Sequence, residues 1–163
     1  MLGLAEAAKQ WGEPYVGHAH SACEYWLRSR AQMIPPNRLF QTDSLPDPSA
    51  VLIASLAMLT LSTCHVNTAC WKNVAESQIA MLVRSSYFTR GGDAYTDILP
   101  GIFWGACYQI RPEQFELVES AWSTFLLMQA LCLLDEFVGV TDPTLKNSHI
   151  YICNERNQKC KKS

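Results

Sequence analysis

The sequence predicts an all-α fold, a compact bundle of about five or six helices around one long buried helix in the C-terminal half of the chain. Residues 112–137 (PEQFELVESAWSTFLLMQALCLLDEF) combine helical periodicity with a nearly uncharged middle, and residues 50–61 (AVLIASLAMLTL) form a second apolar run. The chain is 48% apolar and 17% charged, and 163 residues can bury about two-thirds of their extended surface. We assign one helical domain to residues 1–153 and a flexible basic tail to residues 154–163.

A short first helix is indicated by Leu4, Ala8 and Trp11, which share one helical face. Gly12 and Pro14 follow this face in the sequence. Because neither residue favours continuation of a helix, we expect the first helix to end there.

A second, amphipathic helix is predicted from about His18 to Met33. Its inward face repeats at helical spacing and comprises Ala19, Ala22, Cys23, Trp26, Arg30 and Met33. Pro35-Pro36 ends this pattern, and the four prolines of residues 35–48 predict an irregular loop.

Residues 50–61 are predicted to form a buried core helix. Asp47 has the side chain of a helix N-cap, and Pro48 suits the first helical position. No charged residue occurs from Pro48 to Trp71. The densely apolar part is about half of the roughly 20 residues that a spanning helix needs, so no membrane span is expected.

Two readings remain open for the residues that follow. Residues 49–90 contain no Gly or Pro, so they can form one kinked helix or two helices with a joint near residues 62–68. In the two-helix reading, Asn73 and Glu76 have the spacing of a capping box for a helix that reaches Phe88.

Residues 94–110 are predicted to be irregular but largely buried, because Pro100 and two glycines interrupt an aromatic-rich segment. The long helix then begins at Pro112 and ends before Gly139. Its middle is apolar nearly all round, which predicts that neighbouring elements enclose it. Near the C-terminus, residues 149–153 (HIYIC) alternate weakly and could form an edge strand.

The seven cysteines are best interpreted as reduced thiols. The first residues, MLGLAEAAKQWGEP, lack the basic start, apolar stretch and cleavage site of a secretory signal. We therefore expect a cytoplasmic protein in which most cysteines act as small buried side chains.

The strongest metal-binding hypothesis uses histidine and cysteine, the ligands that zinc prefers. Two groups could supply ligands from different elements; they are His18, His20 and Cys23, and Cys64, His65 and Cys70. No Cys-x-x-Cys pair occurs, so the usual structural zinc spacings are absent. The alternative is that Cys23 belongs to the apolar face of its helix and the histidines lie at a helix end.

Catalytic motifs do not support an enzyme. The sequence has no Walker loop, no G-x-G-x-x-G, no G-x-S-x-G and no H-E-x-x-H. We assign no catalytic residue and no cofactor, and the balance favours a protein that is not an enzyme. A small-molecule or metal-binding protein, or an enzyme that uses the histidines and cysteines above with zinc, is the first alternative.

Nucleic-acid binding is the second alternative. Arg28, Arg30 and Arg38 lie close to aromatic residues in the sequence, and the tail is basic. However, the formal net charge is −2, which gives little general attraction to a phosphate backbone.

The favoured function is a non-catalytic protein-binding module of the inhibitor, immunity or adaptor type. The low charge leaves apolar surface uncovered, and five Trp, six Tyr and six Phe can supply interface anchors. A homodimer would also cover such surface. The acidic residues expected to face a partner, at the two ends of the long helix, are Glu113, Glu116, Glu119, Asp135 and Glu136.

Overall fold

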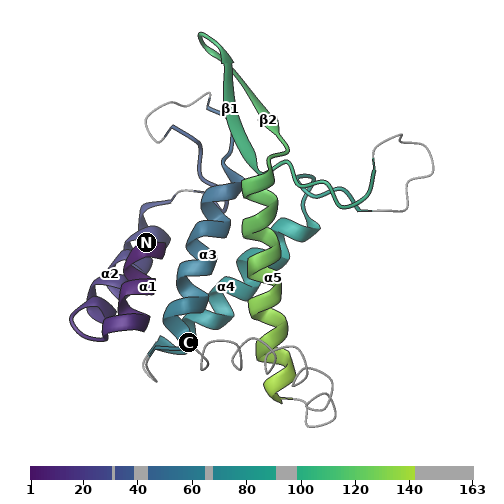
Figure 1. Ribbon diagram of the computed structural model, residues 1–163. Coiled ribbons are helices and arrows are strands. Elements are labelled where there is room, and N and C mark those ends of the chain that lie inside the picture. Colours follow the sequence, from purple (N-terminus) through teal and green to yellow (C-terminus); the bar gives the residue numbers. More distant parts are fainter. Residues whose placement is uncertain (31, 39–43, 65–67, 91–98, 142–163) are drawn as a thin grey trace, which may run out of the picture. The chain divides into compact units, whose positions relative to one another are not determined.

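The computed structural model describes residues 1–30, 32–38, 44–64, 68–90 and 99–141. Within them the chain is mostly helical. It has five helices, α1 to α5, and one antiparallel two-stranded sheet, which follows α4 and precedes α5 in the sequence (Figure 1). The predicted helical character is confirmed, but the strictly all-α prediction is wrong. The chain divides into two compact units, Met1–Ala130 and Leu131–Ser163. The packing described below belongs to the first unit.

The first two helices are α1 (Leu2–Trp11) and α2 (Tyr15–Ser29). α1 ends as predicted at Gly12, whose φ of 70° is unfavourable for other residues and whose N–H donates to the Ala8 carbonyl at 2.9 Å. The buried face of α1 consists of small residues, whereas the predicted inward residue Trp11 is exposed. α2 buries Ala19 and Cys23 as predicted, but it ends at Ser29 and therefore stops short of Met33.

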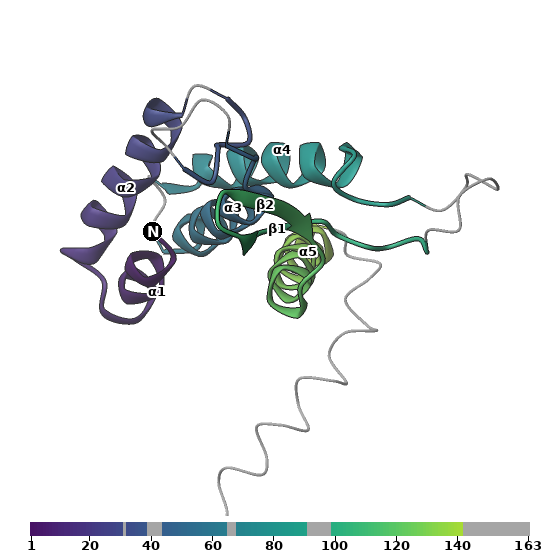
Figure 2. The ribbon, with the colours of Figure 1, turned by 90° about the horizontal axis from the view of Figure 1, so that it is seen from above.

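Helix α3 (Pro48–Ser62) is the most deeply buried element of the first unit. Asp47 caps it by accepting a hydrogen bond from the Ala50 N–H at 3.2 Å, and Pro48 occupies the first turn. The predicted start and core position of this helix are confirmed. α3 packs against α1, α2 and α4, and Figure 2 looks down α3 between α1 and α4.

Helix α4 (Cys70–Arg84) is separate from α3, which decides between the one-helix and two-helix readings. Thr68, in the connection, donates from Oγ1 to the Leu61 carbonyl at 2.7 Å. The same carbonyl also accepts from the Cys64 N–H at 3.0 Å, so both bonds fix the end of α3. The predicted capping box is wrong, because Asn73 and Glu76 lie inside α4, where Glu76 pairs with Lys72 at 3.7 Å.

The sheet is a hairpin of β1 (Ala106–Arg111) and β2 (Gln114–Val118), with a bulge between Gln109 and Arg111. It corrects the prediction that the long helix starts at Pro112. Pro112 suits a helix start, but it also suits the first central position of a hairpin turn. Glu113 takes the second central position with φ 64°, which a helix does not allow.

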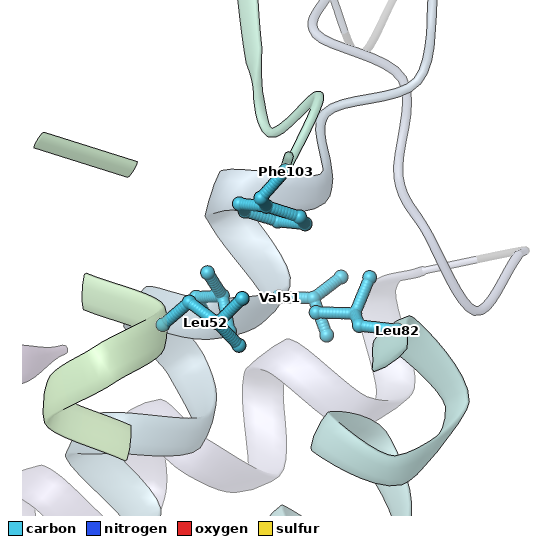
Figure 3. Packing of buried hydrophobic residues seen from close by; sticks show 5 residues of the cluster. Val51, Leu52, Leu82 and Phe103 are labelled. Carbon is cyan, nitrogen blue, oxygen red and sulfur yellow. The ribbon is translucent and has the colours of Figure 1, made fainter. Parts of the chain in front are cut away.

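A cluster of apolar side chains joins the hairpin, α3, α4 and α5; it consists of Val51, Leu52, Leu82, Phe103 and Leu127. Phe103 lies just before β1 and is fully buried against the N-terminal half of α3 (Figure 3). The Ser49 N–H donates to the Gly105 carbonyl at 2.9 Å, so the base of the hairpin is held at the start of α3.

Helix α5 (Ala121–Thr141) begins after Ser120, whose side-chain oxygen accepts from the Ser123 N–H at 3.3 Å. The prediction that this helix is enclosed on all sides is wrong. Ser123, Leu127 and Ala130 are buried, but the opposite side of the same turns is exposed. No helix in the described ranges is long and apolar enough to cross a membrane. The proposed strand at 149–153 and the basic tail at 154–163 lie outside the described residues.

Candidate functional site

A row of large apolar side chains lies open on α5. Trp122, Phe125 and Met128 are 42%, 64% and 56% exposed. Their spacing of three residues places them along one side of the helix. The buried residues Ser123, Leu127 and Ala130 occupy the other side, so the exposed row is the side that faces away from the core.

The row continues onto the hairpin through one hydrogen bond. The indole Nε1 of Trp122 donates to the hydroxyl oxygen of Tyr108, on β1, at 2.9 Å. Tyr108 is itself 46% exposed. These four residues, Tyr108, Trp122, Phe125 and Met128, are referred to below as the α5–β1 apolar face.

The other face of the hairpin is covered by the segment before α3. The Asn37 side-chain amide donates to Cys107 Sγ at 3.0 Å, and the Arg38 guanidinium lies 4.2 Å from the centre of the Phe115 ring. Phe115 and Cys107 alternate with Tyr108 in the register of the two strands, so they occupy the side opposite to it. The Tyr108 side of the hairpin is therefore the side that faces away from this segment.

Acidic residues border the α5–β1 apolar face. Glu116 is the cross-strand neighbour of Tyr108, and Glu119 precedes the start of α5. Both are exposed, as is Glu113 at the hairpin tip. The ion pairs that join two described residues lie in α2 and α4, and they involve none of these three glutamates.

The structure places the five acidic residues that are predicted to bind a partner in two different parts of the chain. Glu113, Glu116 and Glu119 lie on the hairpin and its exit, whereas the sequence places them at the start of the long helix. Asp135 and Glu136 are exposed residues of α5 in the second unit.

The histidine and cysteine residues of the zinc hypothesis have other surroundings. His20 Nδ1 accepts from the Trp71 indole at 3.0 Å, and its Nε2 lies 3.5 Å from a Glu24 carboxylate oxygen. Both ring nitrogens of His20 therefore have partners. His18 is exposed on α2, and Cys70 is exposed at the start of α4.

Burial favours the protonated form of three thiols. It raises the pKa of Cys23 to about 11, and it also raises the pKa of Cys64 and of Cys107. A raised pKa disfavours the thiolate, which is the nucleophilic form of the side chain. Within the described ranges, which omit His65, no three His, Cys, Asp or Glu residues are grouped as a metal site would require. The described cysteines are all free; they are Cys23, Cys64, Cys70, Cys107 and Cys132.

The arginines of the nucleic-acid hypothesis make intramolecular contacts. Arg28 pairs with Glu24 at 3.3 Å. Arg30 lies 5.6 Å from the Trp26 ring centre and donates to the Met33 carbonyl at 3.0 Å. Arg38 stacks on Phe115, as described above. The structure places Arg28 and Arg30 near the end of α2 and Arg38 beside the hairpin.

Further exposed aromatic residues lie on α1 and α2. The rings of Trp11 and Tyr15 are 5.6 Å apart, and Tyr25 is 73% exposed. These residues differ from the α5–β1 apolar face because they belong to separate helices and follow no single row. Tyr25 is a suitable control position, since it is an exposed aromatic residue away from the hairpin.

No protein family, curated protein or solved structure matches the chain. The candidate site therefore rests on its own geometry. The sequence predicts a long helix enclosed by its neighbours, so it does not single out Trp122 and Phe125 as exposed residues. Ser123 and Ala130 are small residues on the buried side, but Ala121 is also small and is exposed, so residue size does not select the buried side.

Proposed function

We propose that the protein is a non-catalytic protein-binding module, of the inhibitor, immunity or adaptor type, that acts through the α5–β1 apolar face. The observation that carries the proposal is the exposed row of Trp122, Phe125 and Met128, with Tyr108 held beside it. Aromatic residues and Met are enriched at protein interfaces, and a few such anchors supply most of the binding energy.

The arrangement also favours a preorganised surface. The Trp122–Tyr108 hydrogen bond limits the rotation of both rings, so less conformational entropy remains to be lost on binding. Leu127, on the other side of α5, is packed into the core cluster and holds the helix in place. A rigid apolar row on a fixed helix suits recognition of a partner surface.

The state of the polar groups supports a role without catalysis. Burial raises the pKa of the Cys23 thiol, and His20 is held between Trp71 and Glu24. A nucleophilic cysteine requires a thiolate, and a general base requires a free acceptor aimed at a substrate. Burial disfavours the thiolate at Cys23. Both ring nitrogens of His20 have partners, so His20 has no free acceptor.

Site-specific photocrosslinking in the native cells tests this function. A benzophenone amino acid is placed at Phe125 in one variant and at Tyr25 in the control variant. We expect a discrete protein adduct from position 125 and none from position 25. Adducts from position 25 alone, or from neither position, would overturn the proposal. Circular dichroism and a thermal melt check that both variants keep the fold, as expected for exposed positions.

A further inference from the structure

The chemistry of the partner is indicated by the charges around the α5–β1 apolar face. In the first unit, residues 112–130 contain three acidic residues, Glu113, Glu116 and Glu119, and no Lys or Arg. Glu116 lies directly across the hairpin from Tyr108, and Glu119 lies three residues before Trp122. A partner that covers Tyr108 and Trp122 therefore meets carboxylates at the edge of its contact. Charged groups at the rim of an interface select partners of opposite sign.

The shape of the exposed row indicates a helical partner. Trp122, Phe125 and Met128 form a ridge at three-residue spacing on α5. Such a ridge fits the groove between side-chain rows on another helix. Recognition of an amphipathic helix by an apolar surface with Met and aromatic residues is a recurrent binding mode.

The same charges disfavour the other ways of covering this face. Two copies of the chain joined through it would bring Glu116 and Glu119 of each copy together, and residues 112–130 supply no Lys or Arg to pair with them. Nucleic-acid phosphates and anionic lipid head groups would be repelled by the same carboxylates. A cationic segment of another protein is the occupant that satisfies both the apolar row and its acidic border.

Resting on the function proposed above, we propose that the partner presents an amphipathic basic helix to the α5–β1 apolar face. Its apolar side covers Trp122, Phe125 and Met128. Its Lys or Arg residues lie beside Glu116 and Glu119. The apolar contact supplies the affinity, and the charge pairs supply the choice of partner and part of the association rate.

Calorimetric titration with synthetic peptides tests this partner chemistry. The probe is an amphipathic peptide of about 18 residues, roughly five helical turns, with Leu and Trp on one side and Lys on the other. The matched peptide has Glu in place of every Lys. We expect the Lys peptide to bind at least about tenfold more tightly than the Glu peptide. Phe125→Asp should abolish binding of the Lys peptide.

Charge-reversal variants test whether Glu116 and Glu119 cause the preference for the Lys peptide. We expect Glu116→Lys and Glu119→Lys each to lower the affinity for the Lys peptide about fivefold. Glu119 lies outside the strands, so its variant tests the charge without altering the hairpin ladder. Glu13→Lys makes the same change in net charge in the turn between α1 and α2, and it should leave the affinity unchanged.

The outcomes separate this proposal from the function on which it rests. Equal binding of the Lys and Glu peptides, lost in Phe125→Asp, would overturn the basic partner but keep the apolar binding face. No binding of the Lys peptide would also overturn the basic partner, and crosslinking at Phe125 would still decide whether the face binds protein. A dimer in sedimentation that Phe125→Asp dissociates would assign the face to a second copy.

Discussion

The indole of Trp122 donates a hydrogen bond to the hydroxyl oxygen of Tyr108 at 2.9 Å, which joins the start of α5 to the middle of β1. These two residues are 14 positions apart in the chain, and both remain partly exposed. The bond links the hairpin to the exposed row of α5. It therefore makes one surface from two elements that the sequence does not show to be neighbours.

This link has a measurable energy. We expect Tyr108→Phe to lower the free energy of unfolding by about 0.5 kcal/mol, because an exposed hydrogen bond has a small net value. A double-mutant cycle with Trp122→Phe, measured by urea unfolding, isolates the coupling between the two side chains. Tyr25→Phe is the control and should have no effect. A coupling energy of zero would contradict the bond.

The backbone conformation of Glu113 at the hairpin tip lowers the stability of the protein. Its φ of 64° is costly for a residue with a side chain, and glycine removes that cost. We expect Glu113→Gly to raise the free energy of unfolding by about 0.5–1 kcal/mol. Glu116→Gly, in the regular part of β2, should instead lower it by about 0.5–1 kcal/mol. Chemical unfolding of the two variants checks both signs. If both variants lose stability, the positive φ assigned to Glu113 is wrong.

Gly105 is required by the Phe103 ring. A Cβ atom at position 105 would overlap the side chain of Phe103, which is fully buried in the core cluster. We expect Gly105→Ala to destabilise the protein by about 1–3 kcal/mol, since the ring has no free space to enter. Gly3→Ala is the matched control, because a Cβ at position 3 meets nothing within 4 Å. Thermal melts that show similar stability for both variants would rule out this packing.

The Cys23 thiol makes stability depend on pH. Burial raises its pKa from the ordinary value of 9.0 to about 11 in the folded protein. Below pH 9.0 both states keep the proton; between pH 9.0 and about 11 only the unfolded state loses it. The stability that Cys23 contributes is therefore present at neutral pH and lost across this window.

We expect the stability difference between wild type and Cys23→Ala to shrink by about 2 kcal/mol from neutral pH to the upper end of that window. Urea unfolding of both proteins at a series of pH values measures this difference. The comparison removes the contributions of the other titrating groups, which are common to both proteins. A stability difference that stays constant with pH would show that folding does not raise the pKa of the Cys23 thiol.

The zinc hypothesis is checked by metal analysis. We expect purified protein to contain no stoichiometric zinc, because His20 is engaged by Trp71 and Glu24 and no three His, Cys, Asp or Glu residues are grouped among the described residues. A chelator should leave the melting temperature unchanged. Stoichiometric zinc, together with a lower melting temperature after chelation, would restore the hypothesis that includes His65.

Several elements follow from local sequence alone. Asp47 and Pro48 start α3 because a carboxylate can cap the first turn and Pro fits its geometry. Gly12 ends α1 because its backbone conformation suits glycine. The continuous uncharged run of α3 requires burial on all sides. Each of these features depends on residues within a few positions of one another.

The hairpin and the open face of α5 depend on distant contacts. Pro112 is compatible with a helix start and with a turn, and the pairing of β1 with β2 favours the turn. On α5, apolar residues occur on every side, so the local pattern cannot select which side is buried. The sequence by itself determined where the helices α1 and α3 begin or end and that α3 lies in the core. Only the tertiary structure decided that Leu127 faces the core and Phe125 the solvent, because the cluster of Val51, Leu52 and Phe103 accepts one side of α5.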